Sequence, residues 1–156
     1  MRPGDWPQLR ALRLEALADT PIGFLETLAA ARDQPDEEWQ ARAARSAEGG
    51  ERCQVMAWDG RRPVANCACF LRDGAAWLAA VYVSPAYRGQ GLLAELAERC
   101  SAWAREQGAE VLRLEVHEAN ARAQAAYRRL GFVMTGDRAR YPLPPGGEEL
   151  TMQRPL

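Results

Sequence analysis

The sequence predicts one α/β domain over residues 1–156, in which helices cover both faces of a mixed sheet. Three observations predict this fold class. The chain is about one domain long, it begins with helical patterns, and its three hairpin-linked strands precede an alternation of helix and strand. Hairpins give antiparallel pairs, and a strand–helix–strand unit gives a parallel pair, so the sheet is expected to be mixed.

The first third of the chain is expected to be helical. Asp5 and Gln8 form a capping-box pattern, and leucines at positions 9, 12, 14 and 17 continue a helical stripe to about residue 18. After the break at "DTPIG", a second helical region runs from about residue 24 to residue 47. Pro35 suits a fresh helix start within it.

Three strands are expected next. "RCQVMAW" at 52–58 and "PVANCACFLR" at 63–72 flank an Asp-Gly hairpin signal, and a second Asp-Gly precedes "AAWLAAVYV" at 75–83. The composition of this third strand predicts burial on both faces.

The second half is expected to alternate between helices and strands. A helix is expected over 91–107, ending at Gly108, and another from the cap Asn120 to Gly131. Between them, "EVLRLEVH" alternates, with Leu112, Leu114 and Val116 on one face and Arg113, Glu115 and His117 on the other. Weaker strands near "FVMTG" and "ELTMQ" close the chain.

Composition argues against several classes of protein. The net charge of −1 gives no reason to expect nucleic acid or a membrane as a partner. The longest apolar run, "AAWLAAVYV", is far shorter than the ~20 residues of a membrane-spanning helix. The first residues have no apolar segment of the kind found in secretion signals, so a cytoplasmic protein is expected.

Two residue types restrict the chemistry. The chain has no lysine, which excludes a Schiff base on its own lysine, and one histidine, which excludes two-histidine zinc motifs. No metal is therefore expected. Cys53, Cys67, Cys69 and Cys100 contain no C-x-x-C pair, and buried free thiols are favoured over a nucleophilic or redox role.

The segment "YRGQGLL" at 87–93 has the features of a phosphate-binding loop. The first N–H groups of a helix lack intrahelical partners, and the helix dipole adds positive charge there. Gly89 and Gly91 would let an oxyanion approach the backbone, and Arg88 would add charge-assisted hydrogen bonds. The alternative is a loop whose glycines serve turn geometry alone.

A dinucleotide-binding site is disfavoured by the position of this loop. "GQGLLA" matches G-x-G-x-x-A, but "SPAY" separates the strand from the glycines. Only about 60 residues follow, too few for a second βαβ half. An NAD-type oxidoreductase is therefore the least favoured of the functions considered for this sequence.

Two motifs resemble the GNAT superfamily of N-acetyltransferases. "VYVSPAYRGQGLL" is similar to its acetyl-CoA-binding segment, Q/R-x-x-G-x-G/A after a strand and a proline-containing turn. Arg88 and Gly91 match, whereas Leu93 stands where glycine or alanine is usual. "LEVHEANARAQAAYRRLGF" at 114–132 matches the second hallmark, an asparagine, a tyrosine seven residues later, and Gly-Phe.

The resemblance implies a GNAT-like fold and direct transfer of the acetyl group of acetyl-CoA to a primary amine. The acceptor would be a small molecule, a peptide or a protein, and the first strand of the family would be absent or a stub, because only "MRPG" precedes Asp5. Family members are often dimers, which leaves a homodimer open. The implied cosubstrate-binding residues are Val81, Tyr82, Val83, Arg88, Gly89, Gln90, Gly91, Leu92, Leu93, Ala94, Asn120 and Tyr127. Arg122 and Arg128 could reach the nucleotide phosphates or be solvated.

The resemblance also implies catalytic roles. Tyr127 would donate a proton to the departing sulfur, since a phenol with a pKa near 10 is protonated at neutral pH. Glu115, twelve residues earlier, matches the position of a general base in relatives that acetylate protein N-termini. His117 on the same strand face has a better matched pKa, and bulk water is the third candidate.

The first two helices and the final hairpin usually form the acceptor wall in this family. Candidate acceptor-binding residues are Phe24, Glu26, His117 and Tyr141, with Glu26 able to attract a cationic amine. A non-catalytic acyl-CoA sensor or interaction domain is the alternative function, which Tyr127 and Glu115 disfavour.

Overall fold

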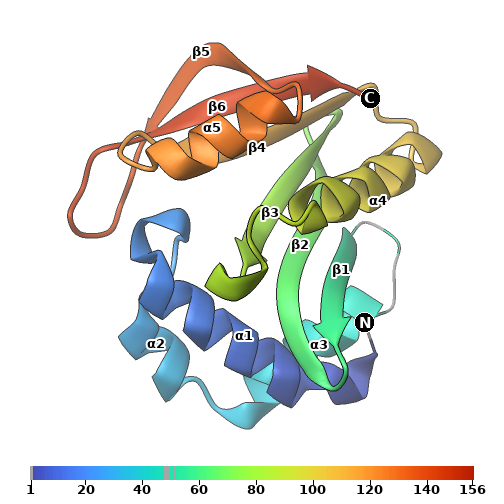
Figure 1. Ribbon diagram of the computed structural model, residues 1–156, viewed down its shortest axis with the longest axis vertical. Coiled ribbons are helices and arrows are strands. Elements are labelled where there is room, and N and C mark those ends of the chain that lie inside the picture. The colour runs from blue at the N-terminus through green and yellow to red at the C-terminus, as the bar shows by residue number, and fades with distance from the viewer. Residues whose placement is uncertain (1, 48–49, 51) are drawn as a thin grey trace.

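A six-stranded mixed sheet organises the computed structural model, which describes residues 2–47, 50 and 52–156 (Figure 1). The strands lie in the order β1-β2-β3-β4-β6-β5, and β3 with β4 is the parallel pair. Their bounds are β1 Arg52–Asp59, β2 Arg62–Arg72, β3 Ala75–Val83, β4 Val111–His117, β5 Val133–Arg140 and β6 Glu148–Pro155. The predicted α/β fold class is confirmed.

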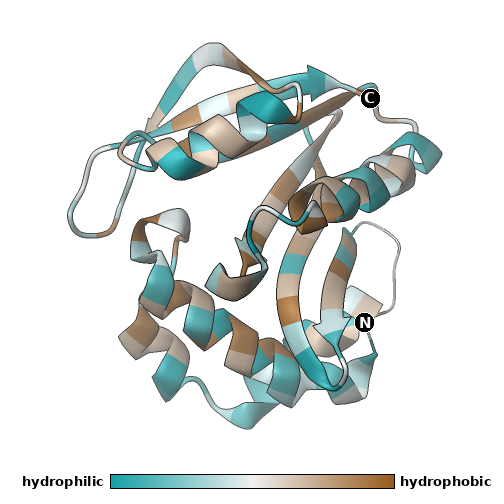
Figure 2. Cartoon of the chain, in the orientation of Figure 1, coloured by the Kyte–Doolittle hydropathy of each residue, from teal (hydrophilic) through white to brown (hydrophobic). Residues whose placement is uncertain are grey.

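Helices cover both faces of the sheet. On one face α1 (Trp6–Asp19), α2 (Leu28–Asp33) and α3 (Asp36–Ala47) enclose a core that includes Leu12, Leu17 and Trp39. On the other face α4 (Leu92–Glu106) and α5 (Ala121–Arg129) enclose the larger core. Hydrophobic residues dominate β2 and β3, which lie between these layers (Figure 2).

The N-terminal third differs from the sequence prediction in two details. Asp5 precedes α1, but its carboxylate accepts a hydrogen bond from the backbone N–H of Arg2 at 2.7 Å, so the predicted capping box with Gln8 is wrong. The second helical region begins at Leu28 rather than near residue 24. Thr27 caps it by accepting from the N–H of Ala30 at 3.1 Å.

The stretch before α1 contains no strand among residues 2–5. Pro3–Asp5 form a 3-10 turn, and β1 is therefore the edge of the sheet on this side. The fold agrees with the expectation that the family's first strand is absent or a stub.

The four cysteines are free thiols. Cys67, Cys69 and Cys100 are buried in the larger core, and Cys53 is half-buried beside them. Burial raises the pKa of Cys69 to about 12, which keeps this thiol protonated. The placement of three of them fits a packing role, as the sequence favoured. In the described part of the chain, no helix is long and apolar enough to cross a membrane.

Candidate active site

The parallel strands β3 and β4 pair over three residues and then diverge. Their register runs from Ala76 with Leu112 to Leu78 with Leu114. Just beyond it, Ala80 adopts a left-handed φ of 50°, the pairing of β2 with β3 shifts register, and the amide of Asn66 donates to the Ala80 carbonyl at 2.7 Å. This bulge bends β3 away from β4.

The divergence leaves a cleft of about 380 Å³. Its walls come from the loop after α1, the end of β3, the start of α4, the end of β4, α5 and β6. Segments distant in sequence therefore converge on one cavity, as the arrangement of β3, α4, β4 and α5 in Figure 1 indicates.

The glycine loop forms one end of the cleft. Gly89 and Gly91 have φ of 76° and 86°, a conformation that strongly favours glycine, and a Cβ added to either residue would have no neighbour within 4 Å. Gly91 precedes α4 and offers no side chain to cap it. The first N–H groups of α4 therefore face open space, which suits an anionic group such as a diphosphate.

Asp19, at the end of α1, holds two arginines at this end of the cleft. The guanidinium of Arg88 contacts its carboxylate and also donates to the Val83 carbonyl at 3.0 Å. Arg122 lies 3.5 Å from the same carboxylate and donates to the hydroxyl of Thr20 at 2.7 Å. Burial opposes ionisation of Asp19, but these hydrogen bonds and charges outweigh it and lower its pKa.

Most predicted cosubstrate-binding residues line the cleft. These are Val81, Tyr82, Val83, Arg88, Gly89, Gly91, Leu92, Leu93, Ala94, Asn120 and Tyr127. Gln90 is not among the lining residues, because its side chain turns back to donate to the Ala86 carbonyl at 2.9 Å. Arg122 lines the cleft, whereas Arg128 does not and instead lies 3.4 Å from the Gln124 side-chain oxygen.

Tyr127 of α5 lines the cleft. It is 8% exposed and packs edge-on against Phe132, with ring centroids 5.9 Å apart. Burial raises its pKa above the ordinary value. The phenol is therefore protonated at neutral pH and can act as a proton donor.

His117 lines the cleft, but both of its ring nitrogens are occupied. Its Nδ1 accepts from the backbone N–H of Ala119 at 3.1 Å, which leaves Nε2–H to donate to the Gly146 carbonyl at 2.8 Å. The ring also packs edge-on against Tyr141 at 4.8 Å. Accepting a proton would break the bond from Ala119, so this geometry disfavours His117 as a base.

Glu115 lies on the same cleft wall and has a cationic partner. Its carboxylate is 3.1 Å from the guanidinium of Arg72, which in turn stacks over the Trp77 ring at 3.6 Å. This pairing holds the carboxylate beside the cleft.

Glu149, which the sequence analysis did not identify, is the second carboxylate in the cleft. It lies on β6 directly opposite His117 of β4, and Glu115 lies opposite Thr151, so both carboxylates project from one face of the sheet. Burial raises the pKa of Glu149 above its ordinary value, and the Glu115 charge adds to this. A signal existed in the alternation of "EELTMQ", but its register against β4 could not be read from the sequence.

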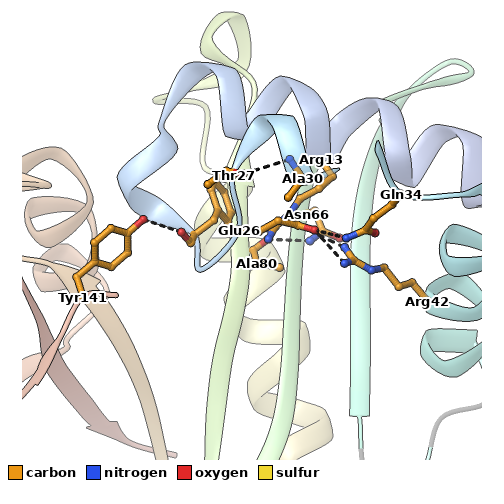
Figure 3. A network of polar contacts seen from close by, with 10 residues as sticks. Arg13, Glu26, Thr27, Ala30, Gln34, Arg42, Asn66, Ala80 and Tyr141 are labelled. Carbon is orange, nitrogen blue, oxygen red and sulfur yellow. Dashed lines mark hydrogen bonds and ion pairs between the residues drawn. The ribbon is translucent and has the colours of Figure 1, made fainter. Parts of the chain in front are cut away.

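Of the other three predicted acceptor residues, one lines the cleft and two do not. Phe24 lines the cleft. Tyr141 lies behind it, with its hydroxyl donating to the Phe24 carbonyl at 2.8 Å. Glu26 is outside the cleft, because it is bound by Arg13 at 2.8 Å, Arg42 at 2.9 Å and Gln34 at 2.7 Å (Figure 3).

Residues 10–132 match the model of the acetyltransferase (GNAT) family. The chain belongs to this family. Streptothricin acetyltransferase of Streptomyces lavendulae is 45% identical over 56 residues, a match that spans 36% of this chain and 30% of that protein. The predicted family membership is confirmed.

Two solved GNAT structures have the same fold along the whole chain. The PaiA N-acetyltransferase of Thermoplasma acidophilum, determined in complex with coenzyme A, is 17% identical with a TM-score of 0.81, and a GNAT acetyltransferase of Streptococcus pneumoniae is 18% identical with a TM-score of 0.83. Each alignment covers 100% of this chain and 96% of the other. Among the described residues, no group of three or more His, Cys, Asp or Glu side chains could hold a metal ion.

Proposed function

We propose that this protein is an N-acetyltransferase that moves the acetyl group of acetyl-CoA directly to a primary amine. The observation that carries the proposal is the single cleft that joins the open N-terminus of α4, the Tyr127 phenol and the Glu115–Glu149 carboxylates. These three features would supply a diphosphate site, a proton donor and a proton acceptor in one cavity.

The cosubstrate would enter between β3 and β4. The glycine loop and the first turn of α4 would hold its diphosphate, and the unpaired backbone at the end of β3 would bind its amide-containing arm. Leu93 would act through its backbone N–H, so its departure from the family pattern leaves the loop functional.

Glu149 is the better base of the two carboxylates. An ammonium group must lose a proton before it attacks, and a carboxylate of ordinary pKa is poorly matched to that task. Burial raises the pKa of Glu149, whereas Glu115 is paired with Arg72. Glu149 therefore takes the proton, directly or through water, while Glu115 keeps the Glu149 pKa high and attracts the cationic acceptor.

Tyr127 completes the reaction on the opposite side of the thioester. As the nitrogen forms its new bond to the acetyl carbon and the carbon–sulfur bond breaks, the phenol donates its proton to the departing sulfur. Free coenzyme A thiol and an N-acetylated amine are the products. The ammonium group loses two protons in all: the first is left on the base, and the second, lost from the nitrogen after its bond to the acetyl carbon forms, restores the Tyr127 phenol.

Release of free thiol from acetyl-CoA tests this function against a panel of peptides, polyamines, aminoglycosides and streptothricin. The relative's name justifies including streptothricin. We expect thiol release with at least one amine, and Tyr127→Phe should lower kcat by about 100-fold or more, far more than it weakens acetyl-CoA binding. Tight acetyl-CoA binding without turnover across the panel would favour the acyl-CoA sensor instead. Thermal stabilisation by NAD but not acetyl-CoA would contradict both.

A further inference from the structure

A second cavity of about 260 Å³ lies next to the cleft, between α1, α3 and the face of β1–β3. Phe24 and Tyr82 line both cavities, so the two cavities adjoin at these side chains. We call it the arginine pocket after the four arginines of its wall. The polar side chains of the wall are Arg13, Arg42, Arg45, Ser46, Arg52, Gln54 and Asn66.

The charge of the pocket wall is strongly positive. It contains four arginines and, among the described residues, no aspartate or glutamate. Glu26 lies outside the wall and compensates Arg13 and Arg42 together, so one carboxylate serves two guanidinium groups (Figure 3). Burial lowers the pKa of Arg13, because the cost of removing its guanidinium from water exceeds the stabilisation that Glu26 gives.

The pocket also contains a polar group without a partner. Trp39 is 1% exposed and lines the pocket, and its indole N–H has no hydrogen-bond acceptor in the described part of the chain. Arg42 stacks over the same ring, with its guanidinium carbon 4.7 Å from the centroid. A wall rich in donors and poor in acceptors is suited to an anion.

The pocket includes the β3 bulge and adjoins the cleft at Phe24 and Tyr82. Ala80, the residue of the β3 bulge, lines it, and the Asn66 side chain that holds the Ala80 carbonyl is part of the wall. Arg52 lies further along the wall, because it pairs with Phe70, four residues along β2 from Asn66. At the rise of a strand this is about 13 Å.

We infer that the arginine pocket binds the anionic end of the acceptor, so that the preferred substrates are amines carrying a carboxylate or similar anion several ångströms from the amino group. The inference rests on the proposed N-acetyltransferase function. The amino group would lie in the cleft, near Glu115 and Glu149, while the anion would lie among the arginines. The two charged walls therefore select opposite ends of one molecule.

Matched acceptors test the inference. Acetyl transfer to 6-aminohexanoate is compared with transfer to hexylamine and to 6-aminohexanoate methyl ester, which have similar length but no negative charge. We expect kcat/KM to be about 10- to 100-fold higher for 6-aminohexanoate, the range that charge-assisted hydrogen bonds support. Calorimetric titration of 6-aminohexanoate measures its binding without turnover.

Two variants locate the preference. In the double variant Arg45→Gln/Arg52→Gln, the kcat/KM for 6-aminohexanoate should be within about threefold of the kcat/KM for hexylamine. Binding of 6-aminohexanoate should weaken, while transfer to hexylamine stays unchanged. Arg32→Gln on α2, outside both cavities, is the control and should keep the ratio. Equal transfer to the charged and uncharged acceptors, or a ratio that survives the double substitution, overturns the inference and leaves the proposed function standing. If no amine is acetylated, the proposed function fails, and absence of 6-aminohexanoate binding heat overturns the pocket independently.

Discussion

Two carboxylates on the same side of the sheet, Glu26 and Glu149, have opposite environments. Glu26 is enclosed by Arg13, Arg42 and Gln34, and although burial opposes ionisation, these partners lower its pKa. Glu149 is half-buried in the cleft wall, where burial and the charge of Glu115 raise its pKa. The first is held as an anion, and the second is free to exchange a proton.

This difference shows that environment, rather than residue type, separates structure from chemistry. Glu26 connects α1 with α3 through its arginines and so fixes the helical layer against which the acceptor would bind. Glu149 gains nothing comparable for stability, which is expected of groups arranged for catalysis. Substitution of each carboxylate by its amide should therefore affect different measurements.

The largest effect should come from Glu149→Gln. Because the amide cannot take the proton of the acceptor, we expect kcat/KM at pH 7 to fall about 100-fold, equivalent to about 2.7 kcal/mol of barrier. The acidic limb of the pH–rate profile should disappear with it. Glu148→Gln is the matched control, because Glu148 is the preceding residue of β6 and projects from the other face, where it pairs with Arg138. Full activity in Glu149→Gln would remove this residue from the mechanism.

Glu26→Gln should instead lower the free energy of unfolding, by about 2 kcal/mol. The loss reflects Arg13, which would remain buried without its anion. Urea denaturation measures it, with Glu38→Gln on the exposed side of α3 as the control. We expect kcat with hexylamine to change little once the folded fraction is taken into account. A variant as stable as the parent would mean that the Glu26 pairs contribute no net stability.

Glu115→Gln should lower kcat/KM less than Glu149→Gln does. It should shift the acidic limb of the pH–rate profile rather than abolish it. Removing the Glu115 charge lowers the pKa of Glu149, so the acidic limb shifts to lower pH. We expect kcat/KM to fall about tenfold, because the cationic acceptor loses one of its two anionic neighbours. If Glu115 were the base, as the motif spacing indicates, the limb would instead vanish in this variant.

The sequence predicted the features that depend on short segments. The strand before the glycine loop, the N-terminus of α4 and the Asn120 cap follow from local patterns, and Tyr127, which its motif singled out, lines the cleft. Each of these is determined by residues within a few turns of one another.

The long-range contacts that set the surroundings of each ionisable side chain could not be predicted from short segments. Glu149 lies opposite His117 through a β4–β6 register that spans 32 positions, and Glu26 meets Arg42 only because α2 and α3 fold back on α1. The sequence could not show that His117 is disfavoured as a base for the same reason, because one of its ring nitrogens is occupied by the distant Gly146 and the other by Ala119. Long-range packing, and not residue type, decided which candidates were free to react.

The smallest expected effect is a gain in stability from Glu149→Gln, visible only at the higher pH. A carboxyl group whose pKa is raised on folding contributes stability that is fully present below its unfolded pKa and is lost as the pH rises through its folded pKa. At pH 4 the parent and the variant should therefore have nearly equal Tm values, because Glu149 is largely protonated in the folded protein. At pH 7 the parent carries a half-buried anion, so the variant should melt at a slightly higher temperature. Glu26→Gln should show the opposite pattern, since its lowered pKa gives stability above about pH 4.5 that is lost as the pH falls. If both variants shifted in the same direction between pH 4 and pH 7, the two carboxylates would not differ in the way their surroundings indicate.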